Sequence, residues 1–134
     1  MEKQVVRIGP LGKFIASGVR SGNVITMSGQ VATDAKGEVV GAGDITAQVR
    51  QAYANIVEVL DAFGATVADV VDETWFVTDL QDVMANLRTV FGVRDEVYGG
   101  EYDVTQTMIE VSGLVYPELL VEIKCVAVVD SASE

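Results

Sequence analysis

The chain contains no histidine, and this absence removes several kinds of chemistry at once. Histidine is the usual general base near neutral pH, a member of the Ser-His-Asp triad and the commonest zinc ligand. Catalysis would therefore depend on carboxylates, hydroxyls, amides, ordered water or the one cysteine, Cys125. A single cysteine also excludes an intrachain disulfide. We expect no metal site.

Basic residues are scarce. Lysine and arginine number 9 against 20 aspartates and glutamates, which gives a net charge of −11. Affinity for nucleic acid comes chiefly from lysine and arginine displacing counterions, so we expect no nucleic-acid partner. The early glycines, Gly9, Gly12, Gly18 and Gly22, lack the spacing of a phosphate-binding loop. The sequence therefore predicts no nucleotide and, more generally, no cofactor.

Long apolar runs are also missing. No stretch approaches the roughly 18 apolar residues of a membrane span, and residues 1–4 lack the basic and apolar pattern of a secretory signal. We expect no membrane partner and a cytoplasmic location. The 134 residues, 49% of them hydrophobic, are enough for one core, so we expect one domain over residues 1–134 with a polar tail at 130–134.

One helix is indicated strongly. It begins after Asp44, a suitable N-cap, and stops at Gly64. Its apolar residues recur every three or four positions, as expected for a helix with one buried face. This stripe consists of Ile45, Val49, Ala52, Ile56, Leu60 and Phe63.

The rest of the chain reads as strands with a second helix, Val83–Val97, that ends at Gly99-Gly100. β-branched and aromatic residues favour strands. The expected strands are Val5–Ile8, Val24–Val31, Glu38–Val40, Val70–Leu80, Thr105–Val111 and Leu119–Val129. This order predicts an α+β fold, a mixed β-sheet with two helices packed on one face. We expect Trp75, Phe76 and Cys125 to be core residues, with the alternative that Trp75 or Phe76 faces a subunit interface.

A carboxylate, Glu122, interrupts the last apolar strand. An ionised carboxylate costs several kcal/mol to bury without a partner, so the position requires an explanation. Strand alternation places Glu122 and Lys124 on one face. Glu122 is therefore either one half of a charge pair with Lys124 on a wet face or a base whose pKa is raised in a poorly solvated cleft.

Several short segments, in order, resemble the Rid family, also called the YjgF family. They are Met27-Ser28-Gly29-Gln30, Trp75 to Leu80, Ile109-Glu110-Val111 and Leu120 to Ile123. The resemblance extends from about Gly9 to Val129. It implies a chorismate-mutase-like fold, a homotrimer with small-molecule clefts between subunits, and the activity of RidA, an imine and enamine deaminase.

The resemblance also implies roles for individual residues. Glu122 matches the catalytic glutamate thought to orient the attacking water, and Ser28 matches a cleft serine that can equally well satisfy backbone groups. The substrate-anchoring arginine and the hydroxyl residue after it fall on Gln106 and Thr107, so the arginine is missing. Gln106 and Thr107 either bind substrate through neutral hydrogen bonds at a polar end of the cleft or are ordinary residues at the start of a strand. The cleft tyrosine falls on Phe14 or Ile15, neither of which supplies a phenol.

Two arginines follow on the second helix. Arg88 and Arg94 lie on roughly opposite sides and are expected to be solvated, although Arg94, near Tyr98, could reach a cleft as a substitute anion anchor. Three functions remain: a Rid-type deaminase of altered specificity, a non-catalytic trimer that binds a small molecule, and a ribonuclease. The charge and the absent histidine disfavour the ribonuclease.

Overall fold

The structure is a computed structural model that describes residues 2–130. The expected polar tail therefore lies, from residue 131 onward, outside the described residues. A seven-stranded sheet forms the centre of the molecule. Its strands are β1 (Lys3–Val6), β2 (Gly18–Ser21), β3 (Val24–Met27), β4 (Gln30–Val31), β5 (Val70–Val77), β6 (Thr105–Glu110) and β7 (Val121–Val128).

The sheet is mixed, as the sequence predicts. Its order is β1-β2-β3-β7-β5-β6, and β4 also pairs with β7. Strands β5 and β6 are parallel, whereas all other pairs are antiparallel. The parallel pair needs a long crossover connection, which the second helical segment supplies. Strand β7 lies in the middle of the sheet: β3 and β4 pair with one of its edges, and β5 pairs with the other.

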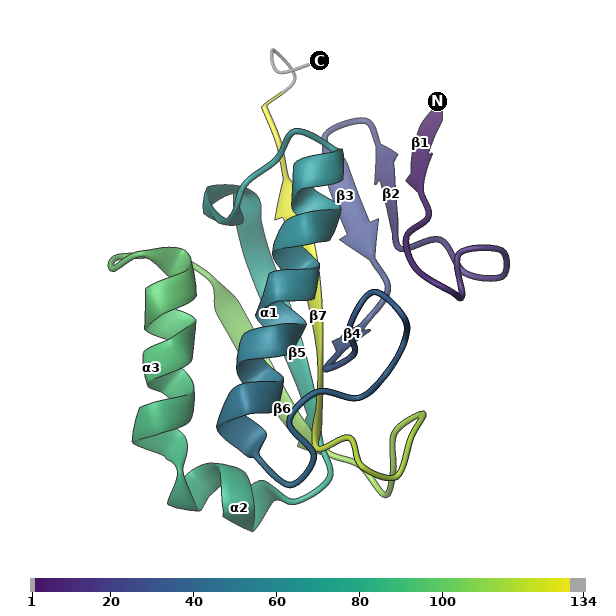
Figure 1. Cartoon of the computed structure of the whole chain (residues 1–134). Coiled ribbons are helices and arrows are strands. Elements are labelled where there is room, and N and C mark those ends of the chain that lie inside the picture. The colour runs from purple at the N-terminus through teal and green to yellow at the C-terminus, as the bar shows by residue number, and fades with distance from the viewer. Residues whose placement is uncertain (1, 131–134) are drawn as a thin grey trace.

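The helices α1 (Ile45–Ala62) and α3 (Leu87–Tyr98) lie side by side on one face of the sheet (Figure 1). Helix α1 begins and ends as predicted: the Asp44 carboxylate accepts a hydrogen bond from the Ala47 amide at 3.1 Å, and Gly64 has a φ of 71°. The predicted stripe is buried from Ile45 to Leu60, while Phe63 is half-buried. Among the described residues, no helix has the length and apolar character needed to cross a membrane.

The second predicted helix, Val83–Val97, is divided into two helices in the structure. Helix α2 (Leu80–Ala85) and α3 meet at Asn86, whose side chain donates to the Asp82 carbonyl at 2.8 Å. Asp79 caps α2 by accepting from the Asp82 amide at 3.1 Å. The predicted end at Gly99 is confirmed, because this glycine adopts a left-handed conformation. A short 3-10 helix, η1 (Val67–Asp69), precedes β5.

The N-terminal region departs most from the prediction. Strand β2 was not predicted, and the expected strand Val24–Val31 is interrupted at Ser28-Gly29, between β3 and β4. The expected strand Glu38–Val40 is reduced to an isolated bridge between Thr33 and Val39.

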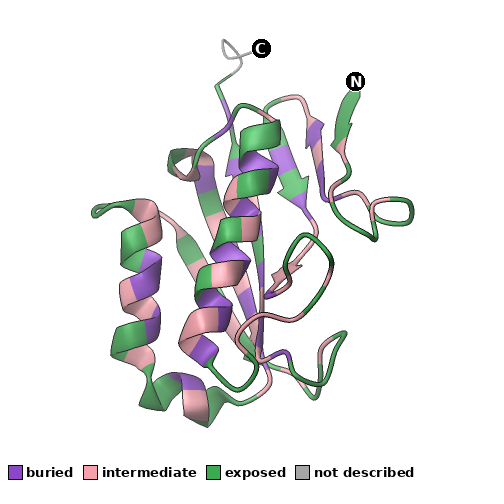
Figure 2. Cartoon of the chain, in the orientation of Figure 1, coloured by how far each residue is buried: buried purple, intermediate pink, exposed green. Residues whose placement is uncertain are grey.

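The core lies between the sheet and the helices (Figure 2). Trp75 and Cys125 are 0% exposed there, as predicted. Burial raises the pKa of the Cys125 thiol to about 12, so it is not a thiolate near neutral pH. Phe76 is half-buried and points to the opposite face, which no helix of residues 2–130 covers (Figure 1). We call this second surface the open face of the sheet.

Candidate functional site

Glu122 lies on the open face of β7. Its Cα pairs with Val31 of β4 on one side and with Phe76 of β5 on the other, and its side chain is half-buried. Burial raises the pKa of Glu122, and the nearby Lys124 lowers it in part. The two side chains interact electrostatically but form no direct ion pair within the described chain. The carboxylate is therefore poorly solvated and is not neutralised by a direct contact with Lys124.

The Ser28-Gly29 interruption provides space for this carboxylate. A Cβ atom at position 29 would lie 2.7 Å from Cδ and 2.8 Å from Cγ of Glu122, which is too close for any real side chain. Glycine is therefore required here for contact with Glu122 and not for its backbone angles, because Gly29 has no positive φ. The Glu122 carboxylate therefore packs directly against the backbone of Gly29.

Ser28 satisfies backbone groups. Its hydroxyl donates to the Ala16 carbonyl at 2.7 Å, and its amide donates to the Ser17 carbonyl at 2.9 Å. These bonds hold the loop before β2 against the turn. Of the two alternatives for Ser28, the positioning of backbone is the one that these contacts support.

A cavity of about 510 Å³ borders the turn. Ser28 and Gly29 form part of its wall, whereas Glu122, which packs against Gly29, does not line it. Its remaining walls come from the loop after β1, the loop after β4, one side of α1, and Tyr116. Of the two residues matched to the family's cleft tyrosine, Ile15 lines this cavity, whereas Phe14 is 80% exposed and does not. Tyr116 brings a phenol to the cavity from a loop that sequence reasoning did not consider.

Amides of α1 fix the strands that carry the site. Gln48 is 0% exposed; its side chain accepts from the Leu120 amide at 2.7 Å and donates to the Glu118 carbonyl at 2.9 Å. It thereby fixes the start of β7, two residues before Glu122. Asn55 donates to the carbonyls of Val31 and Thr33, each at 2.9 Å, and so holds β4. Sequence reasoning missed both residues, although a glutamine beside the buried stripe of α1 was a usable signal.

Gln106 and Thr107 point to opposite faces of β6. The Gln106 amide donates to Glu73 at 3.2 Å on the helix-covered face. Thr107 is exposed on the open face, where its Cα pairs with Thr74. Within one chain, therefore, only Thr107 shares a face with Glu122.

A buried carboxylate, Glu73, organises the helix-covered side of β5 and is 0% exposed. Its donors are Tyr53, Trp75, Arg94, Tyr98 and Gln106. Burial, followed by the charge of Glu73, raises the pKa of Tyr53. We call this group of six residues the Glu73 cluster. Sequence reasoning missed it, although Glu73 shares a strand face with Trp75, a predicted core residue.

Arg94 is not solvated, and the expectation that it could anchor an anion was wrong. Its side chain is 10% exposed and forms an ion pair with Glu73. The rest of its guanidinium donates to the Tyr102 hydroxyl at 3.2 Å and to the Val104 carbonyl at 3.4 Å. Burial acts to lower the pKa of Arg94, but Glu73, together with Tyr53 and Tyr102, raises it above its ordinary value. Arg88 is exposed, as predicted.

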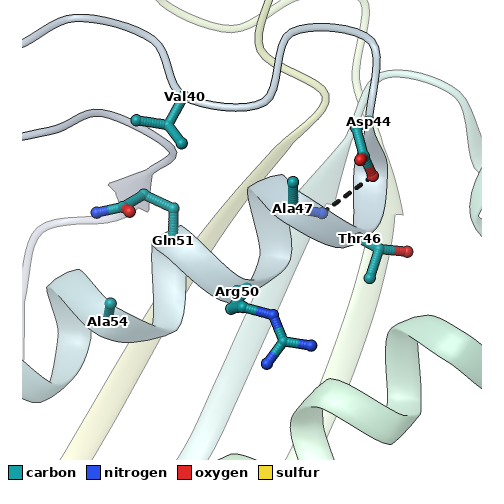
Figure 3. A pocket seen from close by; sticks show the side chains of 7 residues that line it. All are labelled: Val40, Asp44, Thr46, Ala47, Arg50, Gln51 and Ala54. Carbon is teal, nitrogen blue, oxygen red and sulfur yellow. Dashed lines mark hydrogen bonds between the residues drawn. The ribbon is translucent and has the colours of Figure 1, made fainter.

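A second hollow of about 410 Å³ lies at the start of α1 (Figure 3). Its charged groups already have partners. Asp44 caps the helix, and Arg50 forms an exposed ion pair with Glu96 of α3 at 3.0 Å. It offers no candidate for chemistry.

The fold and the turn beside Glu122 define a class of protein: a small α+β domain with a mixed sheet, helices on one face and a desolvated carboxylate on the central strand. The model of the family described as Endoribonuclease L-PSP matches residues 5–129. The chain belongs to this family, the Rid or YjgF family.

Known relatives agree with this assignment. The 2-iminobutanoate/2-iminopropanoate deaminase of Escherichia coli is 34% identical over 122 residues, 88% of each protein. The Rid family protein YyfA from Yersinia pestis is similar in structure, with a TM-score of 0.80 and 27% identity over 96% of this chain and 100% of that one. The structure of Escherichia coli TdcF with bound serine has a TM-score of 0.79 and 25% identity over 95% of this chain and 99% of that one.

Proposed function

We propose that this protein hydrolyses a small imine or enamine metabolite to a carbonyl compound and ammonia. The observation that carries the proposal is Glu122, a half-buried carboxylate with a raised pKa that rests against Gly29 beside a cavity. A carboxylate made more basic by desolvation is a better general base near neutral pH. The similarity to a 2-iminobutanoate deaminase supports the same reaction class.

The reaction needs only one general base. Water donates a hydrogen bond to the Glu122 carboxylate, and its oxygen adds to the carbon of the C=N bond while the carboxylate takes a proton. That proton passes to nitrogen. The carboxylate then takes the hydroxyl proton of the amino alcohol and passes it to the same nitrogen as the C–N bond breaks, so that ammonia leaves and the C=O bond forms. One imine and one water thus give one carbonyl compound and one ammonia.

The proposed working form is a homotrimer. Its support is the open face, which carries exposed apolar residues that include Val24 at 41%, Ile109 at 42% and Val128 at 43%. Exposed apolar patches of this kind are usually covered by another subunit. In such an assembly Phe14, 80% exposed, would be available to a neighbouring cleft, and so would Thr107. A ribonuclease is less well supported because of the net charge of −11 and the absence of histidine.

The test compares ammonia release by the wild type and Glu122→Gln, with imines generated in place from several amino acids by an amino-acid oxidase. We expect the wild type to exceed the uncatalysed rate and Glu122→Gln to lose most of the difference. Glu118→Gln is the matched control, because it removes one exposed carboxylate four residues earlier. Turnover would be refuted if the wild type and Glu122→Gln both released ammonia at the uncatalysed rate. The protein would then be a non-catalytic binder using the same cleft.

A further inference from the structure

The missing arginine leaves open which group of this chain could hold a substrate carboxylate. Arg94 cannot, because Glu73, Tyr102 and Val104 bind its guanidinium in the interior. Gln106 carries no charge, and its amide is bound to Glu73. Lys124 is the only lysine or arginine on the described strands β3 to β7.

Lys124 lies on the same face as Glu122. The two residues are two apart on β7, so their Cα atoms are about 7 Å apart along the strand and their side chains point the same way. In the single chain Lys124 is exposed, and no direct ion pair joins it to Glu122 among the described residues. A ligand spanning the two side chains would meet a cation at one end and a base at the other.

The sheet register adds hydroxyl groups beside this cation. The Cα of Lys124 pairs with Thr74 of β5, and Thr74 pairs with Thr107 of β6. These three residues form one row across the open face, next to the row that contains Glu122 and Phe76. Threonine hydroxyls donate hydrogen bonds to carboxylate oxygens, and a lysine ammonium supplies three donors.

We propose that Lys124 binds the carboxylate of an anionic 2-imino acid, with Thr107 or Thr74 as a second donor, in place of the family's arginine. The inference rests on the proposed function for the identity of the reacting group. An ammonium is a point charge and lacks the planar fork of a guanidinium, so it holds the carboxylate without fixing its plane. This predicts a weaker and more permissive carboxylate site.

Kinetics test the inference with three variants and two substrates. The substrates are the imine of 2-aminobutanoate, which carries a carboxylate, and the imine of propylamine, which does not. Lys124→Gln should raise KM for the first by about tenfold or more, as expected when a charged hydrogen bond is lost, and leave KM for the second unchanged. Lys124→Arg should retain a low KM. Lys3→Gln, on the outer strand β1, makes the same chemical change at a distance and should have no effect.

Binding provides a readout that does not need turnover. Calorimetry with 2-oxobutanoate should show affinity for the wild type and Lys124→Arg, and about tenfold weaker binding for Lys124→Gln. If 2-oxobutanoate binding depends on Lys124 but no turnover is detected, the proposed deaminase activity is refuted and the role of Lys124 in binding the carboxylate is supported. The role of Lys124 would be overturned by turnover whose KM does not change in Lys124→Gln. It would also be overturned if the wild type did not bind 2-oxobutanoate.

Discussion

Gly29 and Glu122 are packed so closely that any side chain at position 29 would occupy the space of the carboxylate. The contact joins the turn between β3 and β4 to the central strand β7. The three nearest atoms all belong to the flexible side chain of Glu122. A larger residue at 29 would thus displace the carboxylate and leave the strands in place.

We therefore predict that Gly29→Ala lowers activity far more than stability. The free energy of unfolding should change by about 1 kcal/mol or less, because the backbone of Gly29 is one that alanine adopts and Glu122 can rotate away. The rate of imine hydrolysis should fall about a hundredfold, because moving a catalytic group by about 1 Å can cost that much. Urea denaturation and the ammonia assay measure the two effects.

The control for this substitution is Gly92→Ala in α3. A Cβ at position 92 meets nothing within 4 Å, so the change should stabilise the helix by about 0.5–1 kcal/mol and leave activity unchanged. If Gly29→Ala retained full activity, the position of the Glu122 carboxylate would not matter for the reaction.

The acid limb of the activity profile should report the ionisation of Glu122. Hydrolysis needs the carboxylate form, so kcat should fall as pH drops through the raised pKa of Glu122. The charged groups on this face of the central strands are Lys124 and, one row further along β5, Asp72. Lys124 lowers the pKa of Glu122, so Lys124→Gln should move the acid limb of kcat to higher pH.

Lys124→Arg keeps the positive charge, so the acid limb of kcat should stay at the same pH. The profile is measured at saturating substrate, so that a change in KM does not enter. A limb that moved to lower pH in Lys124→Gln, or one that persisted in Glu122→Gln, would show that another group controls the rate.

Local sequence signals were enough to predict the elements that carry both a cap and a periodic face. Asp44, the buried stripe and Gly64 placed α1 closely. Strand β2, Gly18–Ser21, escaped because it is short and includes Arg20, a residue that is only 6% exposed. Its burial depends on pairing with β1 and β3, which no local pattern records.

The candidate site was predictable only in part for a similar reason. The unusual position of Glu122 was visible as a carboxylate in an apolar strand. The burial of Arg94 was not visible, because its partner Glu73 lies 21 residues earlier on another element. The face that Gln106 occupies depends on the register between β5 and β6, and a shift of one residue would exchange the roles of Gln106 and Thr107.

The proposed trimer can be tested directly by measuring the molecular mass of the protein in solution. Light scattering during size-exclusion chromatography should give about three times the 14.3 kDa of the chain. Ile109→Lys places a charge on the open face and should shift the mass toward that of one chain. Val115→Lys makes the same change at a loop residue that is 62% exposed, and should not. A wild type that eluted with the mass of a single chain would contradict the trimer.

The Glu73 cluster should contribute strongly to stability through the ion pair with Arg94. Removing one partner of a buried ion pair leaves the other charge uncompensated and typically costs about 3–5 kcal/mol. We predict this loss in the free energy of unfolding for Glu73→Gln and for Arg94→Met, each measured by urea denaturation at one protein concentration. The double variant should lose less than the sum of the two, because the pair is coupled.

The exposed pair between Arg50 and Glu96 is the matched control, since it also joins a neighbouring helix and has side chains 58% and 66% exposed. Solvent screens such pairs, so Arg50→Met and Glu96→Gln should each cost about 1 kcal/mol or less. Equal losses at the two pairs would mean that Glu73 is held mainly by its neutral donors. In that case Tyr53→Phe and Tyr98→Phe, which each remove one hydroxyl donor, would be the costly changes.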